Sequence, residues 1–135
     1  MLKIITILLL FVSTVNTKTA ELTIIINNIS NNNGVIIIGI CDSKDNFPKK
    51  PFIRKSISIK NGIAKIVLKD IKYGELAISI IHDENNNGKL DFHFYGPPKE
   101  KTAASNNASS FFGPPSWEDA KFIINKSIIK HKISM

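Results

Sequence analysis

The sequence predicts an all-β fold, an antiparallel β-sandwich of six to seven short strands with one long loop. The first observation is that apolar, β-branched residues occur in short runs separated by turn-forming residues. The second is that no stretch carries a convincing helical period, and the abundant isoleucine and asparagine are poor helix formers. The 135 residues suffice for one domain with a substantial core, which we expect at residues 21–135.

The first two predicted strands differ in their patterns. In the first, Leu22, Ile24 and Ile26 share one face, and an asparagine-rich turn at residues 27–34 ends it. Residues 35–40 are apolar on both faces, as expected for a central strand. A loop marked by Pro48 and Pro51 follows. The sandwich therefore begins with one amphipathic strand and one fully apolar strand.

The remaining strands follow from turn chemistry and alternation. Asn61-Gly62 is typical of a type I′ turn, so residues 56–60 and 63–68 are predicted to form a hairpin. After a turn at residues 70–74, alternation predicts a strand that buries Leu76, Ile78 and Ile80. Residues 121–124 and 127–133 are predicted as closing strands.

The long loop spans residues 82–119. Loops beyond roughly 15 residues are uncommon in compact domains and are usually functional or disordered. This one is punctuated by proline and glycine and carries specific motifs instead of low-complexity sequence. We therefore expect it to be ordered and to hold the functional site.

The N-terminus has the architecture of a signal peptide. Lys3 precedes a stretch at residues 4–12 that is apolar apart from Thr6, and residues 13–20 are small and polar. Nine residues in a helix span roughly 14 Å, about half of a bilayer core, so no transmembrane anchor is expected after cleavage. We predict that residues 1–20 are a signal peptide, cleaved after Thr17 or Ala20, and that the protein is exported, either periplasmic or secreted.

Composition argues against a nucleic-acid partner despite a formal net charge of +7. Arg54 is the only arginine, and no segment concentrates arginine and aromatic residues together. Nucleic-acid binders use arginine forks and stacked aromatic rings. Cys41 is the only cysteine, so no intrachain disulfide can form, and its place at the end of an apolar run predicts burial.

A calcium-loop spacing occurs at residues 83–91. Asp83, Asn85, Asn87 and Asp91 take positions one, three, five and nine, and the carbonyl of Lys89 takes position seven. Oxygens at this spacing converge on a hard cation, and the glycine at position six permits the sharp turn. Position twelve lacks the bidentate glutamate and no helices flank the loop, so it is not an EF-hand. The alternative is an asparagine turn that bonds its own backbone.

A second hypothesis uses His82, Asp91 and His93. Imidazole and carboxylate ligands hold zinc or copper, and Asp91 and His93 share a face if that stretch is extended. This would make the chain a metal-handling or hydrolytic protein.

Catalytic motifs are absent from the sequence: it has no G-x-S-x-G and no phosphate-cradling glycine loop. The acid pairs Asp83 with Asp91 and Glu118 with Asp119 are candidates for glycoside chemistry, but neighbouring loop acids are more often solvated or metal-bound. These observations favour a binding or accessory module over an enzyme, with an unknown extracellular or envelope ligand. A structural envelope protein is a third class.

Four motifs together resemble a known family. They are H-D-E-N-x-N-G-x-x-D at 82–91, G-x-P-x-E at 96–100, S-N-N-A at 105–108 and G-P-P-S-W-E-D-A-x-F at 113–122. Their order is similar to that of the exported bacterial family catalogued as domain of unknown function 2141. The resemblance implies an extracytoplasmic bacterial protein and a sandwich like transthyretin-like or carboxypeptidase-regulatory-like domains. It implies no established activity, cofactor or catalytic residue.

The chain departs from that family at one place. Where the family tends to have an aromatic residue and a glycine before S-N-N-A, this chain has Thr102, Ala103 and Ala104. If this position lines a binding surface, the departure bears on which ligand this member prefers.

Overall fold

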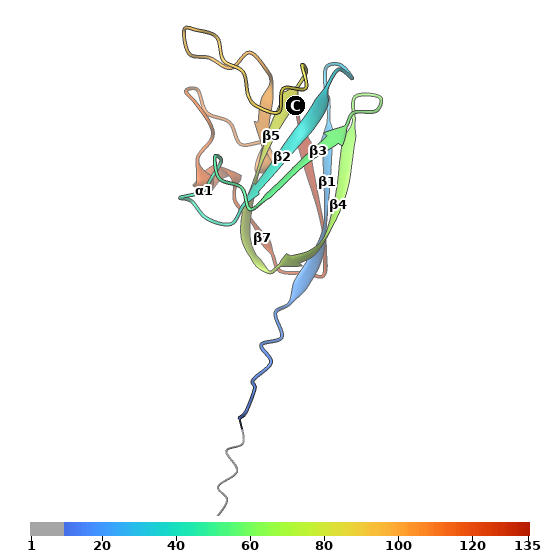
Figure 1. Ribbon diagram of the computed structural model, residues 1–135, viewed down its shortest axis with the longest axis vertical. Helices are drawn as coiled ribbons and strands as arrows, with labels where there is room; N and C mark the ends of the chain where they lie inside the picture. The colour runs from blue at the N-terminus through green and yellow to red at the C-terminus, as the bar shows by residue number, and fades with distance from the viewer. Residues whose placement is uncertain (1–9) are drawn as a thin grey trace, which may run out of the picture.

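A computed structural model describes residues 10–135, which form two β-sheets packed face to face (Figure 1). The smaller sheet contains β1 (Thr19–Asn27), β4 (Ala64–Lys72) and β8 (Ile128–Ser134) in the order β4-β1-β8. The strand β1 pairs with β4 antiparallel and with β8 parallel. The prediction of an all-β sandwich is confirmed, although this sheet is mixed and not purely antiparallel.

The larger sheet carries five strands, which are β2 (Val35–Cys41), β3 (Ile53–Ser58), β5 (Gly74–Asp83), β6 (Thr102–Ala104) and β7 (Phe122–Ile124). Its order is β3-β2-β5-β6, and β7 pairs with the first residues of β5. The strand β2 is thus central, as its two apolar faces predicted. The total of eight strands in the described residues exceeds the predicted six to seven because β6 lies inside the predicted long loop.

The core lies between the two sheets and follows the alternation in the sequence. The inward faces of β1 and β5 are buried completely or nearly so, as in Leu22 and Ile24 on β1 and Ile78 and Ile80 on β5. The opposite face of the larger sheet carries a second, smaller cluster. That cluster comprises Cys41, Ala77, Ala104, Trp117 and Ala120, with Phe47 and Ala108 packed against it. Cys41 is buried as predicted.

The predicted hairpin at residues 56–68 is only partly present. The turn forms, because Asn61 and Gly62 both have positive φ and Lys60 and Ile63 exchange two backbone hydrogen bonds. Pairing ends there, since β3 joins β2 in one sheet and β4 joins β1 in the other. The hairpin prediction was wrong beyond the turn because a strand's partner depends on where its apolar face finds a core.

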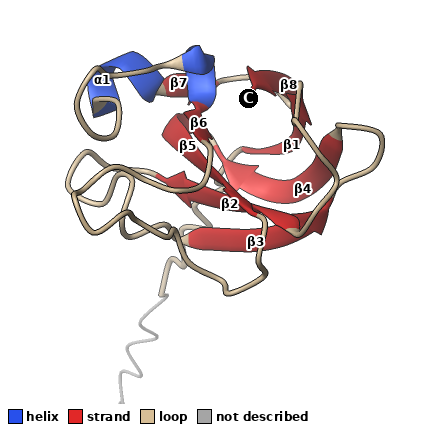
Figure 2. Cartoon of the chain, turned by 90° about the horizontal axis from the view of Figure 1, so that it is seen from above, coloured by secondary structure: helices blue, strands red, loops and turns tan. Residues whose placement is uncertain are grey.

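Two short helical segments interrupt the predicted loop. They are the 3₁₀ helix η1 (Ser105–Asn107) and the single-turn helix α1 (Trp117–Ala120), which lie over one end of the larger sheet (Figure 2). The side chain of Ser116 accepts a hydrogen bond from the Asp119 amide and so caps α1. No helix among the described residues is long and apolar enough to cross a bilayer.

The predicted signal peptide falls partly outside the described residues, which exclude positions 1–9. Residues 10–18 contain no strand or helix. Ala20, at the end of the predicted signal peptide, pairs with Ile71 and is buried in the core. The first strand therefore begins two residues before the predicted domain boundary.

Candidate functional site

The predicted calcium loop begins at a buried point of the larger sheet. His82 and Asp83, at the end of β5, are 0% and 1% exposed. The Nε2 atom of His82 lies 2.8 Å from the Asn33 carbonyl oxygen, which ties β5 to the turn before β2. A Cβ atom at Gly34 would lie only 1.9 Å from the Asp83 carbonyl oxygen. Only glycine fits at position 34. The close approach of its backbone to Asp83 fixes where the loop starts.

The side chain of Asp83 organises the loop backbone. Its Oδ1 accepts a hydrogen bond from the Asn87 amide at 3.2 Å, and its Oδ2 accepts one from the Gly88 amide at 2.8 Å. Asn86 and Gly88 take the left-handed conformation, which turns these amides inward. A buried carboxylate that accepts two backbone amides is well satisfied. Asp83 therefore fixes the backbone of the loop through both of its carboxylate oxygens.

Three of the predicted ligands converge on one point. The Nδ2 atoms of Asn85 and Asn87 each donate to Asp91 Oδ2 at 2.7 Å. The Oδ1 atoms of the same two side chains accept backbone amides of residues 87 and 89. The hydrogen bond from Asn85 lowers the pKa of Asp91, and those from Asn87 and the charges of Lys89 and Lys99 add to it. Asp91 is thus an ionised acceptor at the centre of the loop.

Glu100 closes the base of the loop, a role that sequence reasoning did not assign. Its Oε1 accepts the Glu84 amide at 3.2 Å, and its Oε2 accepts the Asp91 amide at 3.1 Å. Between these points residues 91–99 double back, with hydrogen bonds joining Lys99 to Asp91 and His93 to Pro97. The only available signal was the place of Glu100 in the G-x-P-x-E motif.

The donor set fits calcium in kind. Carboxylate, amide and carbonyl oxygens are the ligands that this cation takes, and water completes a coordination number of six to eight. Asn85 and Asn87 present nitrogen to Asp91, so a cation there requires both amides to turn Oδ1 inward by rotation about χ2. Such a rotation gives up the two hydrogen bonds to Asp91 and the two that the Oδ1 atoms accept from backbone amides, in exchange for two metal ligands.

The second metal hypothesis is not supported by the geometry. Within residues 10–135, no three His, Cys, Asp or Glu side chains come close enough together to hold a metal ion. His82 is buried with Nε2 on a backbone carbonyl, whereas His93 stacks on Tyr95 with ring centroids 4.8 Å apart. His82, Asp91 and His93 therefore do not form one site.

The S-N-N-A motif anchors the second half of the long loop. The Oγ atom of Ser105 accepts a hydrogen bond from the Ile78 amide at 2.9 Å and donates to the Ala120 carbonyl. The Nδ2 atom of Asn106 donates to the carbonyls of Asp119 and Lys121 at 3.1 and 2.8 Å. These bonds join η1 to β5 and to the C-terminal end of α1. They hold both ends of the segment 108–116 against the larger sheet.

A cleft of about 1140 Å³ separates the two halves of the long loop. Its floor is the outer face of β2 and β5, where Ile37, Gly39, Ser79 and Ile81 lie. The segments 42–52, 84–101 and 105–116 all lie on this side of the sheet, at the left of Figure 1 in teal, gold and salmon. Thr102, Ala103 and Ala104, where the chain departs from the resembled family, also line the cleft.

The cleft walls carry apolar rings and positive charge. Five aromatic residues line it, and four of them are more than half exposed: Phe92, Tyr95, Phe111 and Phe112. Its charged side chains are Lys49, Arg54 and Lys89, and no carboxylate is among its lining residues. In the described part of the chain none of these three cations pairs with a carboxylate. The cleft is therefore apolar and cationic.

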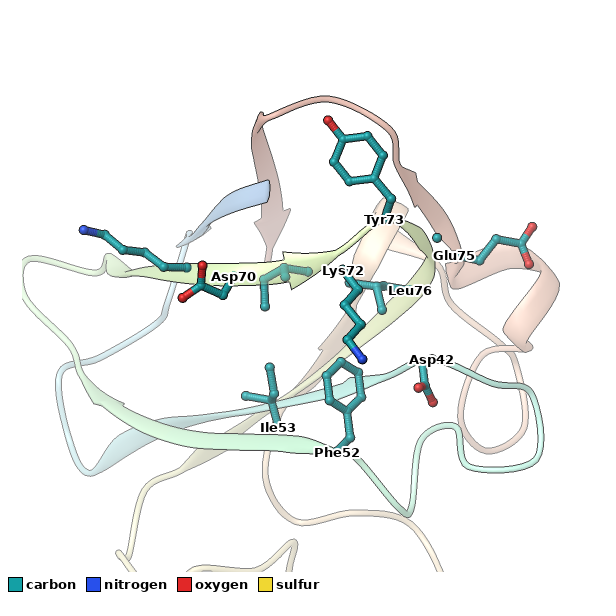
Figure 3. Close-up of a pocket in the computed structure, with 11 residues that line it drawn as sticks. Asp42, Phe52, Ile53, Asp70, Lys72, Tyr73, Glu75 and Leu76 are labelled. Atoms are coloured by element: carbon teal, nitrogen blue, oxygen red, sulfur yellow. The ribbon is translucent and has the colours of Figure 1, made fainter. Parts of the chain in front are cut away.

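A second cavity of about 500 Å³ opens between the sheets at the other side of β3. Figure 3 shows Asp42 and Asp70 on opposite sides of Phe52 and Lys72. Its charges are of both signs and its carboxylates do not converge. Unlike the cleft between the two loop halves, this cavity does not present charge of a single sign.

The fold and the cleft define the class of protein: an all-β sandwich with a large loop-built cleft on one sheet. The family follows from comparison with known proteins. The profile of the family described as "Uncharacterized protein conserved in bacteria (DUF2141)" matches residues 24–131, and the chain belongs to this family. The resemblance seen in the motifs is confirmed. No curated protein matches the chain, and no solved structure matches it.

Proposed function

We propose that this protein is an exported binding module that takes its ligand in the cleft between the two halves of the long loop, and that calcium stabilises one wall of this cleft. The observation that carries the proposal is the cleft itself. Binding sites are concave and mostly apolar with a few placed polar groups, and drug-sized ligands occupy about 300–1000 Å³. A cleft of about 1140 Å³ with exposed rings on its walls has the chemistry of such a site and is slightly larger than this range.

The calcium loop is part of the cleft wall. Gly88, Lys89 and Leu90 line the cleft, and the Arg54 guanidinium donates a hydrogen bond to the Gly88 carbonyl. A cation held by Asp91, Asn85 and Asn87 would stabilise this wall from behind. Asparagine at two ligand positions and no bidentate glutamate place the affinity at the weak end, about 0.1–1 mM, as in extracellular modules.

Export is supported by both ends of the predicted signal segment. Residues 1–12 have the charge and apolar run of a signal peptide. Leu10, Phe11, Val12 and Val15 are each at least 80% exposed and make no contribution to the core. Because Ala20 is buried in β1, cleavage after Thr17 would leave the strand whole. Intact mass of protein from the envelope fraction should therefore lack residues 1–17, and full-length protein in the cytosol would contradict export.

The single tryptophan offers a direct test of the cleft. Trp117 contacts Phe47, a cleft residue, with ring centroids 6.1 Å apart, so its fluorescence should report occupancy. Mature protein would be titrated with short peptides of either charge, with soluble oligosaccharides and with anionic or zwitterionic vesicles. At least one class should change the fluorescence of Trp117.

The test variant and its control each replace one exposed phenylalanine, and only the first of these residues lines the cleft. Phe112→Ser removes an aromatic wall of the cleft, whereas Phe94→Ser removes a fully exposed ring that is not among the residues lining it. The response should be lost in Phe112→Ser and kept in Phe94→Ser. A response that survives Phe112→Ser, or no response to any class, would overturn the proposed function.

A further inference from the structure

The charge of the cleft selects its ligand. Lys49, Arg54 and Lys89 reach it from three different segments, and its lining residues include no acid. Clefts lined by one sign of charge with apolar walls concentrate ligands of the opposite sign. The ligand that complements this surface is therefore anionic along part of its length.

The polar groups of the cleft are too few for a neutral glycan. Its lining residues include no Asp, Glu, Asn or Gln, and its uncharged polar side chains are limited to serine, threonine and one tyrosine. A saccharide brings many hydroxyl groups, and each must find a partner if it is buried. The apolar walls would leave most of them without one.

The floor also disfavours a ligand that adds a strand. The strands β2 and β5 lie inside the sheet, so their backbone groups are already used by neighbouring strands. A ligand that lies on the face of these strands receives few backbone hydrogen bonds. It must therefore bring a backbone that does not need them.

A polyproline II peptide meets these conditions. Its backbone has no internal hydrogen bonds and is solvated, and grooves lined by aromatic rings recognise it by packing on its prolines. Exposed rings stand on both sides of this cleft, with Phe92 and Tyr95 in one half of the loop and Phe111 and Phe112 in the other. Acidic side chains between the prolines would meet the three cations.

We propose that the cleft binds an extended, proline-rich peptide segment that carries acidic residues, an inference that rests on the proposed function of the cleft. Proline rings pack on the exposed aromatic walls. Carboxylates of the peptide pair with Lys49 and Lys89 at the rim. The preformed peptide conformation keeps the entropy cost of binding low, because little chain freedom is lost.

The test uses an acetylated and amidated peptide of three Pro-Glu-Pro repeats, titrated into the mature protein and followed by Trp117 fluorescence and calorimetry. We expect saturable binding that weakens about tenfold in Lys49→Glu and in Phe112→Ser. Lys126→Glu, an exposed lysine outside the cleft, and Phe94→Ser are the matched controls and should bind as the wild type. Raising the salt concentration to about 1 M should weaken binding, because rim charges are screened.

A peptide of three Pro-Lys-Pro repeats separates the outcomes. Equal binding of both peptides would overturn the acidic character of the ligand. If neither peptide binds while an oligosaccharide or an anionic vesicle gives a response that Phe112→Ser abolishes, the peptide inference is overturned and the proposed function stands. If nothing binds, both fail.

Discussion

The two halves of the long loop stand on opposite walls of one cleft but are held in different ways. The first half, residues 84–101, is held by carboxylates: Asp83, Asp91 and Glu100 accept amides from within the loop itself. The second half is held by neutral side chains that bond the backbone of β5 and of the C-terminal end of α1. The structure of the first wall therefore depends on charged side chains, whereas that of the second depends on neutral side chains that bond the backbone.

This difference predicts different responses to solution conditions. Carboxylates at a loop can exchange their hydrogen bonds for a cation, so the first wall should respond to calcium and to acid. Ser105 is completely buried among backbone partners, so the second wall should not respond to calcium. The variants below test this contrast, from the largest expected effect to the smallest.

Ser105→Ala should have the largest effect. It leaves the buried amide of Ile78 and carbonyl of Ala120 without a partner, a loss of about 3 kcal/mol at roughly 1–3 kcal/mol per group. Urea denaturation would measure the free energy of unfolding with and without calcium. The exposed Ser109→Ala is the matched control and should stay within about 0.5 kcal/mol of the wild type. If the loss of unfolding free energy in Ser105→Ala depended on calcium, the two walls would not differ in their response to calcium.

Asp91→Ala should abolish the calcium response with little effect on the metal-free protein. At calcium one hundred times Kd, linkage stabilises the wild type by about 2.7 kcal/mol, or several degrees in Tm. Asp91 suits the test better than Asp83, because removing the buried Asp83 would also orphan two backbone amides. The exposed Asp45→Ala should respond like the wild type. A wild-type Tm that is indifferent to calcium would reduce the loop to an asparagine turn.

The same carboxylate should set the pH range of the proposed calcium binding. Because the pKa of Asp91 is lowered, its charge and the stability that the charge confers are present above the unfolded value near 3.8. Both are lost as pH falls below that value through the folded pKa. Calcium affinity measured by calorimetry should thus hold from pH 7 to about 5. A decline centred near neutral pH would point to a histidine instead.

His131 should give the second wall a weaker pH dependence of its own. Burial lowers the pKa of this imidazole, whose Nε2 accepts the Asn106 amide at 3.1 Å and must be unprotonated to do so. Stability from this group is present above pH 6.5 and declines as pH falls through the lower folded pKa. His131→Gln should flatten the loss of Tm between pH 7 and 5, whereas His93→Gln, in the first wall, serves as the control.

Cys41 should report opening of the second wall through the reactivity of its thiol. It is buried in the cluster with Trp117 and Ala104, and burial, aided by Asp42, raises its pKa to about 11. The thiol should therefore resist iodoacetamide at pH 8 in the folded protein, because the thiolate is the nucleophile. Ser105→Ala should label faster, as it loosens this cluster. Equal labelling rates in Ser105→Ala and the wild type would show that the S-N-N-A motif does not hold the cluster around Cys41 closed.

The sequence predicted the local parts of the site well. The left-handed Gly88, the turn at Asn61-Gly62 and the asparagine side chains that accept the backbone amides of the loop all depend on residues within a few positions of one another. The predicted convergence of ligand oxygens is not seen, because Asn85 and Asn87 present Nδ2 to Asp91. Glu100 and Arg54 escaped sequence reasoning because their partners lie at distant positions. Glu100 lies 16 residues from Glu84, and Arg54 lies 34 residues from Gly88.

The sequence by itself determined the all-β class and the inward faces of β1 and β5, because alternation is a local property that burial alone enforces. It also determined the family, through the order of four motifs. Only the tertiary structure decided that β3 and β4 part into different sheets, that β8 runs parallel to β1, and that the two loop halves face each other across a cleft. The physical reason is that strand pairing and cleft formation depend on contacts between distant segments, and one sequence pattern is compatible with several such pairings.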